Sequence, residues 1–391
     1  MPLLLFRLLP WEFAIRNLLR RPLRSGLTFV GLTTILLLVL AVIGFIRGLE
    51  RSLAKSGDAR TAIIFGMGMG ENLEYSSIPA RTASLVESSV DGVQQRYGRR
   101  YASPELYQAT MLVVGDRKEP SMGLVRGVTP NVLLVRRQVE LTEGSWPQPG
   151  EVLIGRLAAA KLSVSNDELA IGKTIELEGR SWRISGRFTA ANSVFGSEIW
   201  CRLDDLQDAM QRQDLSLVAV TLRPDADFAD FDAFCKGRPE LELQMVQEKT
   251  YYAGLQRDYK PVRMLAWLIA LMVAAAGVFA GLNTMYGAVM GRVRELATLQ
   301  TLGFSRRAVL VSLIQESVVL SVAAALAAGG IALFVFNGMA IRFTMGAFEM
   351  RVDSVALLVG FVVALVLGVI GAIPPAIRAL RMPVVDGLKA V

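Results

Sequence analysis

The sequence predicts an α-helical membrane protein with four transmembrane helices and an α+β extracytoplasmic domain inserted between helices 1 and 2. Two observations predict this class. Four long apolar segments are present, one near the N-terminus and three in the last third of the chain, and short basic segments flank them. The hydrophobic fraction of 52% and the mean hydropathy of +0.42 agree, because both values are high for a soluble protein.

The first apolar segment, residues 26–46, carries no charge over 21 positions. A helix rises about 1.5 Å per residue, so about 20 such residues cross the hydrocarbon core of a bilayer. A cleaved signal peptide is the alternative, because basic residues precede the segment. We favour a retained anchor, because the apolar run is longer than that of a signal peptide and no small-residue cleavage site follows it.

Three further spans follow in the last third of the chain. They are residues 264–290, residues 308–341, and residues 354–377, which contain the helix-breaking pair Pro374 and Pro375 near their end. The predicted order of the remaining parts is a cytoplasmic N-terminal amphipathic segment (1–25), an extracytoplasmic domain (47–263), a cytoplasmic helix (291–307), a short outer loop (342–353) and a cytoplasmic tail (378–391).

Charge predicts the orientation of the spans. The N-terminal segment, the link between spans 2 and 3, and the tail together hold twelve basic and three acidic residues, whereas residues 47–264 hold 28 basic and 29 acidic residues. Short basic segments stay in the cytoplasm. Both termini and the link are therefore expected inside, with the large domain outside. The overall charge of +7 follows from this topology and does not predict nucleic-acid binding.

The composition excludes several kinds of catalytic site. The chain has no histidine, which removes Ser-His-Asp and Cys-His nucleophile systems and His-ligated zinc. Cys201 and Cys235 both fall in the outer segment, where oxidation is feasible. We favour two buried thiols; a disulfide is the alternative, because spacing alone does not show whether the two residues approach each other. We expect no bound metal or cofactor.

The outer segment shows a mixed α and β pattern. Thr174 to Glu178 and Ser181 to Phe188 alternate, with Trp182, Ile184 and Phe188 on one face, and Gly179 with Arg180 is expected to turn them into a hairpin. Other predicted strands are residues 61–65, 109–114, 121–128, 151–154, 198–202 and 216–222, and predicted helices are residues 80–97, 156–162, 203–212 and 225–236. A break at residues 144–150 indicates two lobes.

Three motif-like strings in this segment are interpreted as ordinary structure. Gly172–Thr174 resembles the end of a phosphate-binding loop, but Asp167 stands where that loop needs glycine. The Gly66–Gly70 string is not the dinucleotide fingerprint, and we expect a turn there. The acidic residues of 225–232 lack the glycine and the terminal glutamate of a calcium loop, so a solvated helix start is favoured.

Small residues in the membrane spans predict close helix packing. Gly277 and Gly281 lie one turn apart, which lets a neighbouring helix approach closely. Few polar side chains lie in the spans, which disfavours an ion channel. Glu316 is an intramembrane carboxylate and therefore a functional candidate. Pairing with an arginine near the cytoplasmic end is favoured over a role in transport.

The link between spans 2 and 3 reads GRVRELATLQTLGFSRR (291–307). Val293, Leu296, Leu299 and Leu302 recur at helical spacing, and Gly303 is a typical helix stop. This pattern predicts a short cytoplasmic amphipathic helix joined closely to two spans. Such an element suits force transfer from a cytoplasmic partner; packing of its apolar face on the protein's own spans is the alternative.

Three strings carry a resemblance to a known family. They are RVRELATLQTLGFSRRAVLVSLIQES (292–317), AIRNLLRRPLRSGLTFVGL (14–32) and IPPAIRALRMPVVDGL (373–388). Together they resemble the FtsX-superfamily (type VII) permeases of ABC transporters, in the MacB-like and LolC-like group. The outer string EVLIGRLAAAKL, followed by the hairpin, resembles the MacB-like periplasmic domain. Nearly the whole chain is covered, without the fused ATPase domain of MacB.

The resemblance implies a non-catalytic permease subunit of the bacterial inner membrane. It implies mechanotransmission in a homodimer, or a dimer with a related permease, driven by a separate cytoplasmic ABC ATPase that binds ATP and Mg, with a periplasmic membrane-fusion adaptor as a further partner. On this basis, Leu296, Leu299 and Leu302 are expected to anchor the ATPase, with Arg294 and Glu295 at the rim and Gly303 at the helix end.

The resemblance leaves two functions open. In the first, the permease exports or extracts a lipid, lipoprotein, peptide or hydrophobic compound. In the second, it is an FtsX-like regulator of a cell-wall hydrolase that transports nothing. The outer segment is as large as those of the MacB-like and LolC-like proteins, which favours the first. A membrane-anchored enzyme is disfavoured, because no nucleophile or metal-ligand constellation is present.

Overall fold

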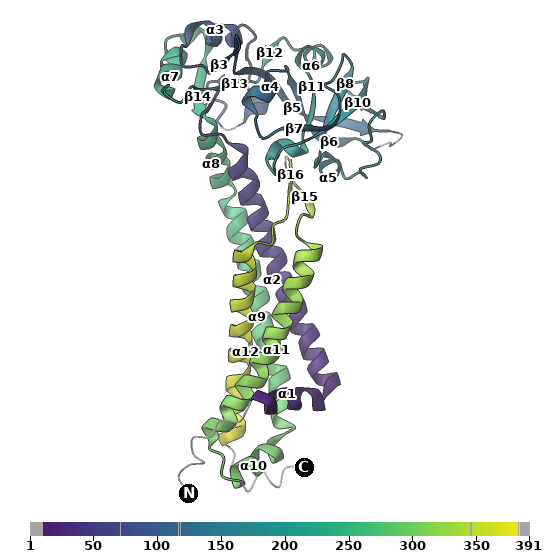
Figure 1. Cartoon of the computed structure of the whole chain (residues 1–391), viewed down its shortest axis with the longest axis vertical. Coiled ribbons are helices and arrows are strands. Elements are labelled where there is room, and N and C mark those ends of the chain that lie inside the picture. Colours follow the sequence, from purple (N-terminus) through teal and green to yellow (C-terminus); the bar gives the residue numbers. More distant parts are fainter. Residues whose placement is uncertain are drawn as a thin grey trace. The chain divides into compact units, whose positions relative to one another are not determined.

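The computed structural model describes residues 11–70, 72–115, 117, 119–344, 346–381 and 383, without the side chain of residue 13 (Figure 1). The chain divides into two compact units. The membrane unit comprises Met1–Arg47, Pro261–Gly338 and Arg351–Val391. The outer unit comprises Gly48–Lys260 and Met339–Met350.

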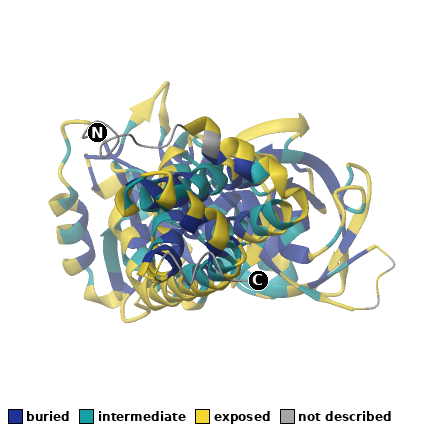
Figure 2. Cartoon of the chain, turned by 90° about the horizontal axis from the view of Figure 1, so that it is seen from below, coloured by how far each residue is buried: buried dark blue, intermediate teal, exposed yellow. Residues whose placement is uncertain are grey.

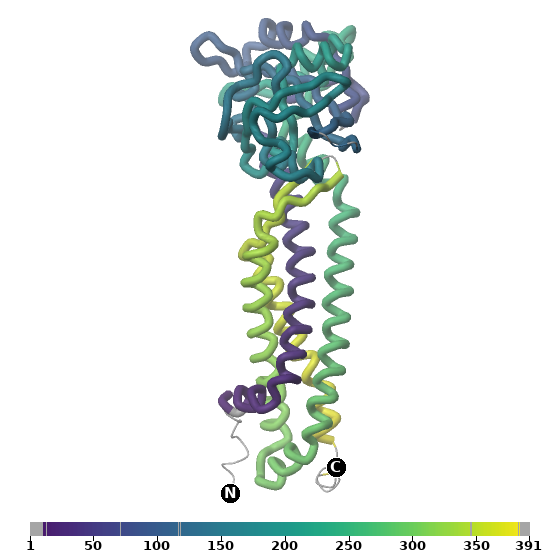
Figure 3. Tube along the Cα trace, turned by 90° about the vertical axis from the view of Figure 1, so that its right-hand side faces the viewer, coloured from purple at the N-terminus to yellow at the C-terminus, as the bar shows by residue number. Residues whose placement is uncertain are grey.

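Four helices of the described chain are long and apolar enough to cross a membrane. They are α2 (Pro22–Ser56), α9 (Lys260–Met290), α11 (Arg306–Val335) and α12 (Ser354–Arg381). Helix α1 (Trp11–Arg20) precedes α2, and the short helix α10 (Val293–Thr301) joins α9 to α11. Figure 3 shows the four long helices running beside one another, with α1 and α10 at the same end of the bundle.

The ends of two predicted spans are corrected. Helix α11 stops at Val335 rather than at residue 341, because the chain turns at Gly338, whose φ of 84° suits glycine. The predicted outer loop 342–353 instead contains most of a hairpin of β15 (Ala340–Phe343) and β16 (Gly346–Glu349). Helix α12 continues through Pro374 and Pro375 to Arg381, because neighbouring helices hold a proline-containing membrane helix together.

Small side chains let the membrane helices approach closely. Leu36, Leu40 and Ile43 of α2 share one buried cluster with alanines of α11 and α12. A Cβ atom built on Gly360 of α12 would lie 2.8 Å from Leu40 Cδ2. Figure 2 shows buried residues among the helices and exposed residues on their outward faces, as expected where lipid replaces water as the surrounding medium.

The outer unit is built on a ten-stranded, mainly antiparallel sheet in the order β14-β1-β13-β5-β6-β11-β8-β10-β7, with β9 paired to β10 and β5. The strands are β1 (Thr61–Gly66), β5 (Ala102–Val114), β6 (Ser121–Val128), β7 (Glu140–Gly144), β8 (Glu151–Gly155), β9 (Thr174–Leu177), β10 (Arg180–Thr189), β11 (Ile199–Arg202), β13 (Leu217–Thr221) and β14 (Leu243–Gln247). Two short pairs are β2 (Ile78–Pro79) with β12 (Asp214–Leu215), and β3 (Gln95–Arg96) with β4 (Arg99–Arg100).

Short helices cover this sheet. They are α3 (Thr82–Ser89), α4 (Val132–Val135), α5 (Ala158–Leu162), α6 (Leu203–Met210), α7 (Phe228–Lys236) and α8 (Glu248–Asp258), with 3-10 turns η1 (Leu73–Tyr75), η2 (Val194–Ser197) and η3 (Pro239–Leu241). Figure 1 shows α3 and α7 near β14 at one end of the sheet and α6 beside β11 and β8 at the other. The predicted helix 80–97 is corrected, because α3 ends at Ser89 and residues 95–96 form a strand.

Strand β5, rather than residues 144–150, joins the two halves of the outer unit. Its first residues pair with β13 and its later residues pair with β6 and β9. The predicted lobe boundary was wrong, because β7 and β8, on either side of residues 144–150, both pair with β10. One buried apolar cluster extends from β1 across β5 to β10.

The β9–β10 hairpin forms as predicted, with its turn shifted by one residue. Leu177 pairs with Arg180, so Glu178 and Gly179 form the turn, and both have positive φ values (50° and 69°). Two consecutive positive φ values are typical of the hairpin turn whose twist matches that of the strands. Trp182, Ile184 and Phe188 are buried, as the alternation predicted.

Candidate functional sites

Helix α10 packs against the membrane unit's own helices through one apolar face. Val293 and Leu296 are buried, and they share a cluster with Val309 and Leu313 of α11 and Leu380 of α12. Leu299 is half-buried at the edge of this cluster. The sequence places these leucines on one face because they recur every three residues.

This packing corrects the predicted set of docking anchors. Leu296 is 5% exposed and Leu299 is half-buried against the chain's own helices, so neither offers a free apolar side chain to a partner. Leu302 is 65% exposed and lies just after the last residue of α10. Arg294, Glu295 and Gly303 are also exposed. The exposed surface of α10 is therefore mainly polar, with one large apolar side chain at its end.

Glu316 of α11 lies in an ion-pair cluster that fastens α1, α10 and α11 together. Arg292 Nη1 donates to both carboxylate oxygens of Glu316 (3.0 Å each), and Asn17 Nδ2 donates to Glu316 Oε2 (2.8 Å). Arg292 and Arg21 both also donate to Glu295. Glu316 has the arginine partner that the sequence analysis favoured, and this arrangement gives the carboxylate a structural role.

The two glycines predicted at a close helix contact lie in different surroundings. A Cβ on Gly277 would lie 2.9 Å from Ile35 Cγ2 of α2, so this position packs against the first span. A Cβ on Gly281 would meet no atom within 4 Å in the described chain. The backbone of Gly281 lies near Gly371 of α12.

The remaining sequence candidates carry no reactive site. Cys201 and Cys235 are buried free thiols, so the alternative of a disulfide is not realised. Burial raises the pKa of both, that of Cys235 to about 12, and unreactive protonated thiols follow. Asp227 caps α7 by accepting from the Ala229 N–H (3.1 Å). Among the described residues no group of three potential metal ligands comes together.

Sequence reasoning missed a cluster of five buried charged residues in the outer unit. Arg126 of β6 donates to both carboxylate oxygens of Glu198 (2.6 and 2.7 Å) and to Glu105 of β5 (2.6 Å). Arg136 donates to Glu105 (3.2 Å) and contacts Glu248 at the start of α8. Charged residues inside apolar strand segments were the available signal, since Arg126 follows Leu124 and Val125.

Comparison with known proteins covers nearly the whole chain. The MacB-like periplasmic core domain matches residues 25–233, which is more than half of the chain, and the FtsX-like permease C-terminal domain matches residues 267–384.

The chain belongs to the MacB/FtsX-type permeases of ABC transporters.

Two relatives show how the permease compares in length. It is 20% identical to the ABC transporter permease YknZ of Bacillus subtilis (strain 168), over 97% of this chain and 98% of that protein. It is 22% identical to the macrolide export ATP-binding/permease protein MacB of Shewanella sp. (strain ANA-3), over 94% of this chain. The permease spans 58% of the length of that MacB relative.

Solved outer domains of the same kind are also similar to the permease. The periplasmic region of MacB from Actinobacillus actinomycetemcomitans aligns with 51% of this chain and 94% of that one, at 12% identity and a TM-score of 0.40. The permease is a multi-pass protein of the bacterial inner membrane, and its large domain lies on the extracytoplasmic side.

Proposed function

We propose that the permease transmits ATP-driven motion from a separate cytoplasmic ABC ATPase to its outer unit. The observation that carries the proposal is helix α10, which has one face buried in the membrane unit and the other face exposed. The basic character of the segment assigns it to the cytoplasm. A helix fastened in this way moves with α9 and α11 as one body, which suits a lever driven by a partner.

The exposed face of α10 suits a docking interface with one apolar anchor. Leu302 would enter a pocket on the ATPase, while Arg294 and Glu295 lie at the rim. A few buried anchors dominate the energy of such interfaces. Burying a leucine side chain contributes about 1.5 to 3 kcal/mol. ATP and Mg would bind to the ATPase, and the permease itself would be non-catalytic.

The continuity of α2 between the membrane unit and the outer unit supports mechanotransmission. Helix α2 is one continuous helix whose residues up to Arg47 belong to the membrane unit and whose last residues belong to the outer unit. Motion of the membrane helices would therefore reach the outer unit without an intervening flexible linker. The work done would be export or extraction of a lipid, lipoprotein, peptide or hydrophobic compound. The name of the macrolide exporters among its relatives supports this substrate range.

We further propose that two copies of the permease, or one copy and a related permease, form the working unit. Helix α9 is the least buried of the four spans, so it keeps the largest apolar surface for lipid or for a second copy. A periplasmic membrane-fusion adaptor would be a third partner on the outer side.

The docking assignment is tested by Leu302→Asp. The substitution removes the anchor and brings a carboxylate to the interface, so the permease should lose the co-expressed ATPase in a pull-down while keeping its wild-type yield. Leu296→Asp is the contrasting variant, because it places a carboxylate in the permease's own buried cluster and should lower the yield. Full recovery of the ATPase by well-expressed Leu302→Asp would refute the assignment.

A further inference from the structure

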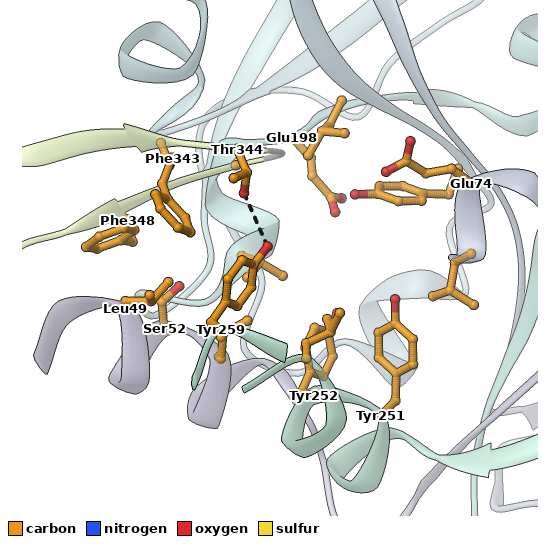
Figure 4. A pocket seen from close by; sticks show the side chains of 18 of the residues that line it. Leu49, Ser52, Glu74, Glu198, Tyr251, Tyr252, Tyr259, Phe343, Thr344 and Phe348 are labelled. Carbon is orange, nitrogen blue, oxygen red and sulfur yellow. Dashed lines mark hydrogen bonds between the residues drawn. The ribbon is translucent and has the colours of Figure 1, made fainter. Parts of the chain in front are cut away.

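The outer unit contains a cavity of about 190 Å³. It lies between the end of α2, the turn η1, helix α8 and the β15–β16 hairpin, all of which belong to this unit (Figure 4). An engineered apolar cavity of about 150 Å³ binds benzene, so a space of this size accepts a single ring or a short chain. Typical drug-sized ligand pockets are larger, at about 300 to 1,000 Å³.

Aromatic side chains form much of the cavity wall. The ring centroids of Tyr259 and Phe343 lie 5.3 Å apart, and those of Phe343 and Phe348 lie 6.1 Å apart. Tyr251 and Tyr252 of α8 meet edge to face at 5.1 Å. Figure 4 shows these five side chains around the space, with Phe343 and Phe348 together on one side. Such rings favour apolar groups and also cations placed over their faces.

The other side of the cavity carries carboxylates. In Figure 4, Glu74 and Glu198 lie on the side away from Phe348. Both carboxylate oxygens of Glu198 already accept hydrogen bonds from Arg126, and Glu198 also accepts one from Trp200 Nε1 (2.7 Å). Glu74 is half-buried, and no salt bridge to it occurs in the described part of the chain. Burial raises the pKa of Glu74, although Lys161 partly opposes this.

The cationic side chain in the described cavity wall, that of Arg126, is already neutralised. Arg126, which lines the cavity, is held by Glu105 and Glu198 and lies 4.3 Å from the centre of the Tyr107 ring. Lys161 Nζ donates to the Thr344 carbonyl (2.7 Å). An anionic ligand would therefore find no unpaired cation in the described cavity wall, which Lys161 does not line, whereas a cationic ligand would find Glu74 and the aromatic rings.

We propose that this cavity binds a small amphipathic amine, whose ring or short chain lies against Phe343 and Phe348 and whose ammonium group pairs with Glu74. The inference stands apart from the proposed function, because binding requires neither the ATPase nor transport. The bound ammonium would supply the close ion-pair partner that the half-buried carboxylate of Glu74 lacks in the described chain.

The test uses the full-length permease in lipid nanodiscs, without the ATPase. Three probes share one phenylpropyl skeleton: 3-phenylpropylamine, the neutral 3-phenylpropan-1-ol and the anionic 3-phenylpropionate. Ligand-observed NMR titrations, corrected with empty nanodiscs, give each Kd. We expect the amine to bind about tenfold more tightly than the alcohol, or better, as a charge-assisted hydrogen bond allows.

Matched variants separate the two ends of the site. Glu74→Gln should remove the preference for the amine and leave binding of the alcohol unchanged. Glu87→Gln should alter neither, because Glu87 lies on α3 outside the cavity. It is a matched control, since it is also a half-buried glutamate whose pKa is raised by burial. Phe343→Ala should weaken both probes. Equal binding of amine and alcohol, an unchanged preference in Glu74→Gln, or tightest binding of the carboxylate would overturn the proposal.

Discussion

Individual charged residues determine how the core of the outer unit is held together. Glu105 lies between Arg126 and Arg136, and the three side chains are almost fully buried. Burial alone would raise the pKa of Glu105, but the two guanidinium groups outweigh it and hold that pKa below its usual value. Glu198 and Glu248 complete the cluster, which links β5, β6 and α8. Each of these buried charges is therefore stabilised by its oppositely charged partners.

Arg136→Met should destabilise the outer unit strongly. It leaves the carboxylates of Glu105 and Glu248 with less compensation, and breaking a buried ion pair typically costs about 3 to 5 kcal/mol. Arg137→Met is a matched control, because the neighbouring Arg137 is exposed, donates to Gln94 and lies over the Tyr101 ring, and it forms no salt bridge within the described residues. Thermal unfolding and limited proteolysis of the full-length permease measure the difference. Equal stability of the two variants would contradict a central role for the cluster.

Glu105 should also make stability depend on pH. Its folded-state pKa lies below the unfolded value of about 4.3, so its contribution is fully present above that value and is lost as the pH falls through the lower folded-state pKa. The apparent melting temperature should therefore fall on acidification below about pH 4.3. Glu105→Gln should be less stable at neutral pH and should show a smaller acid-induced decrease. A steeper decrease in the variant would show that the assigned direction is wrong.

At the scale of elements, glycines on α12 set how closely the membrane helices pack. A Cβ on Gly368 would lie 2.5 Å from Ser321 Oγ and 3.3 Å from the Ser317 carbonyl oxygen of α11. A side chain there requires Ser321 or the two helices to move. In a membrane, this close contact replaces the hydrophobic driving force that operates in water. The position of α12 against its neighbours therefore depends on glycines, because they have no side chain that would hold the helices apart.

Gly368→Leu should destabilise the helix bundle by about 1 to 3 kcal/mol, the usual cost of overpacking. Gly330→Leu on α11 introduces the same side chain at an exposed position where a Cβ meets no atom within 4 Å of the described chain. Only the first variant should lower the apparent melting temperature in detergent. Equal losses in both variants would mean that leucine disturbs the helices for reasons other than contact between α11 and α12.

At the scale of the whole molecule, the proposed dimer is the contact that the single chain does not contain. The open side of Gly281 on α9 has no contact within the described chain, whereas Gly277, one turn earlier, packs on Ile35. The same helix thus presents one small residue to its own bundle and leaves another free. This separation allows the two kinds of packing to be tested independently.

Gly281→Leu should lower the dimer fraction without lowering the stability of the single chain. The added side chain meets open space within the described chain, so a loss of dimer would report a clash with a second copy, again of about 1 to 3 kcal/mol. Cross-linking in native membranes and light scattering in detergent measure the fraction. Gly330→Leu serves as the control, and an unchanged dimer in Gly281→Leu would place the interface elsewhere.

Local features of the sequence determined much of the architecture. Uncharged runs of about 20 residues determine the spans, flanking arginines determine their orientation, and alternation determines strands such as Arg180–Thr189, because each signal lies within a few neighbouring residues. The family resemblance was readable for the same reason, since its strings are continuous.

Only the tertiary structure decided which partners those local elements find. The spacing of Leu296, Leu299 and Leu302 predicted an apolar face, but the packing of α11 and α12 decided that Leu296 is covered and Leu302 is exposed. The joining of the sheet through β5, the pairing of Glu316 with Arg292 and the five buried charges likewise depend on residues far apart in the sequence. Helical and strand periods fix the direction of a side chain relative to its own element, whereas burial depends on which distant element lies against it.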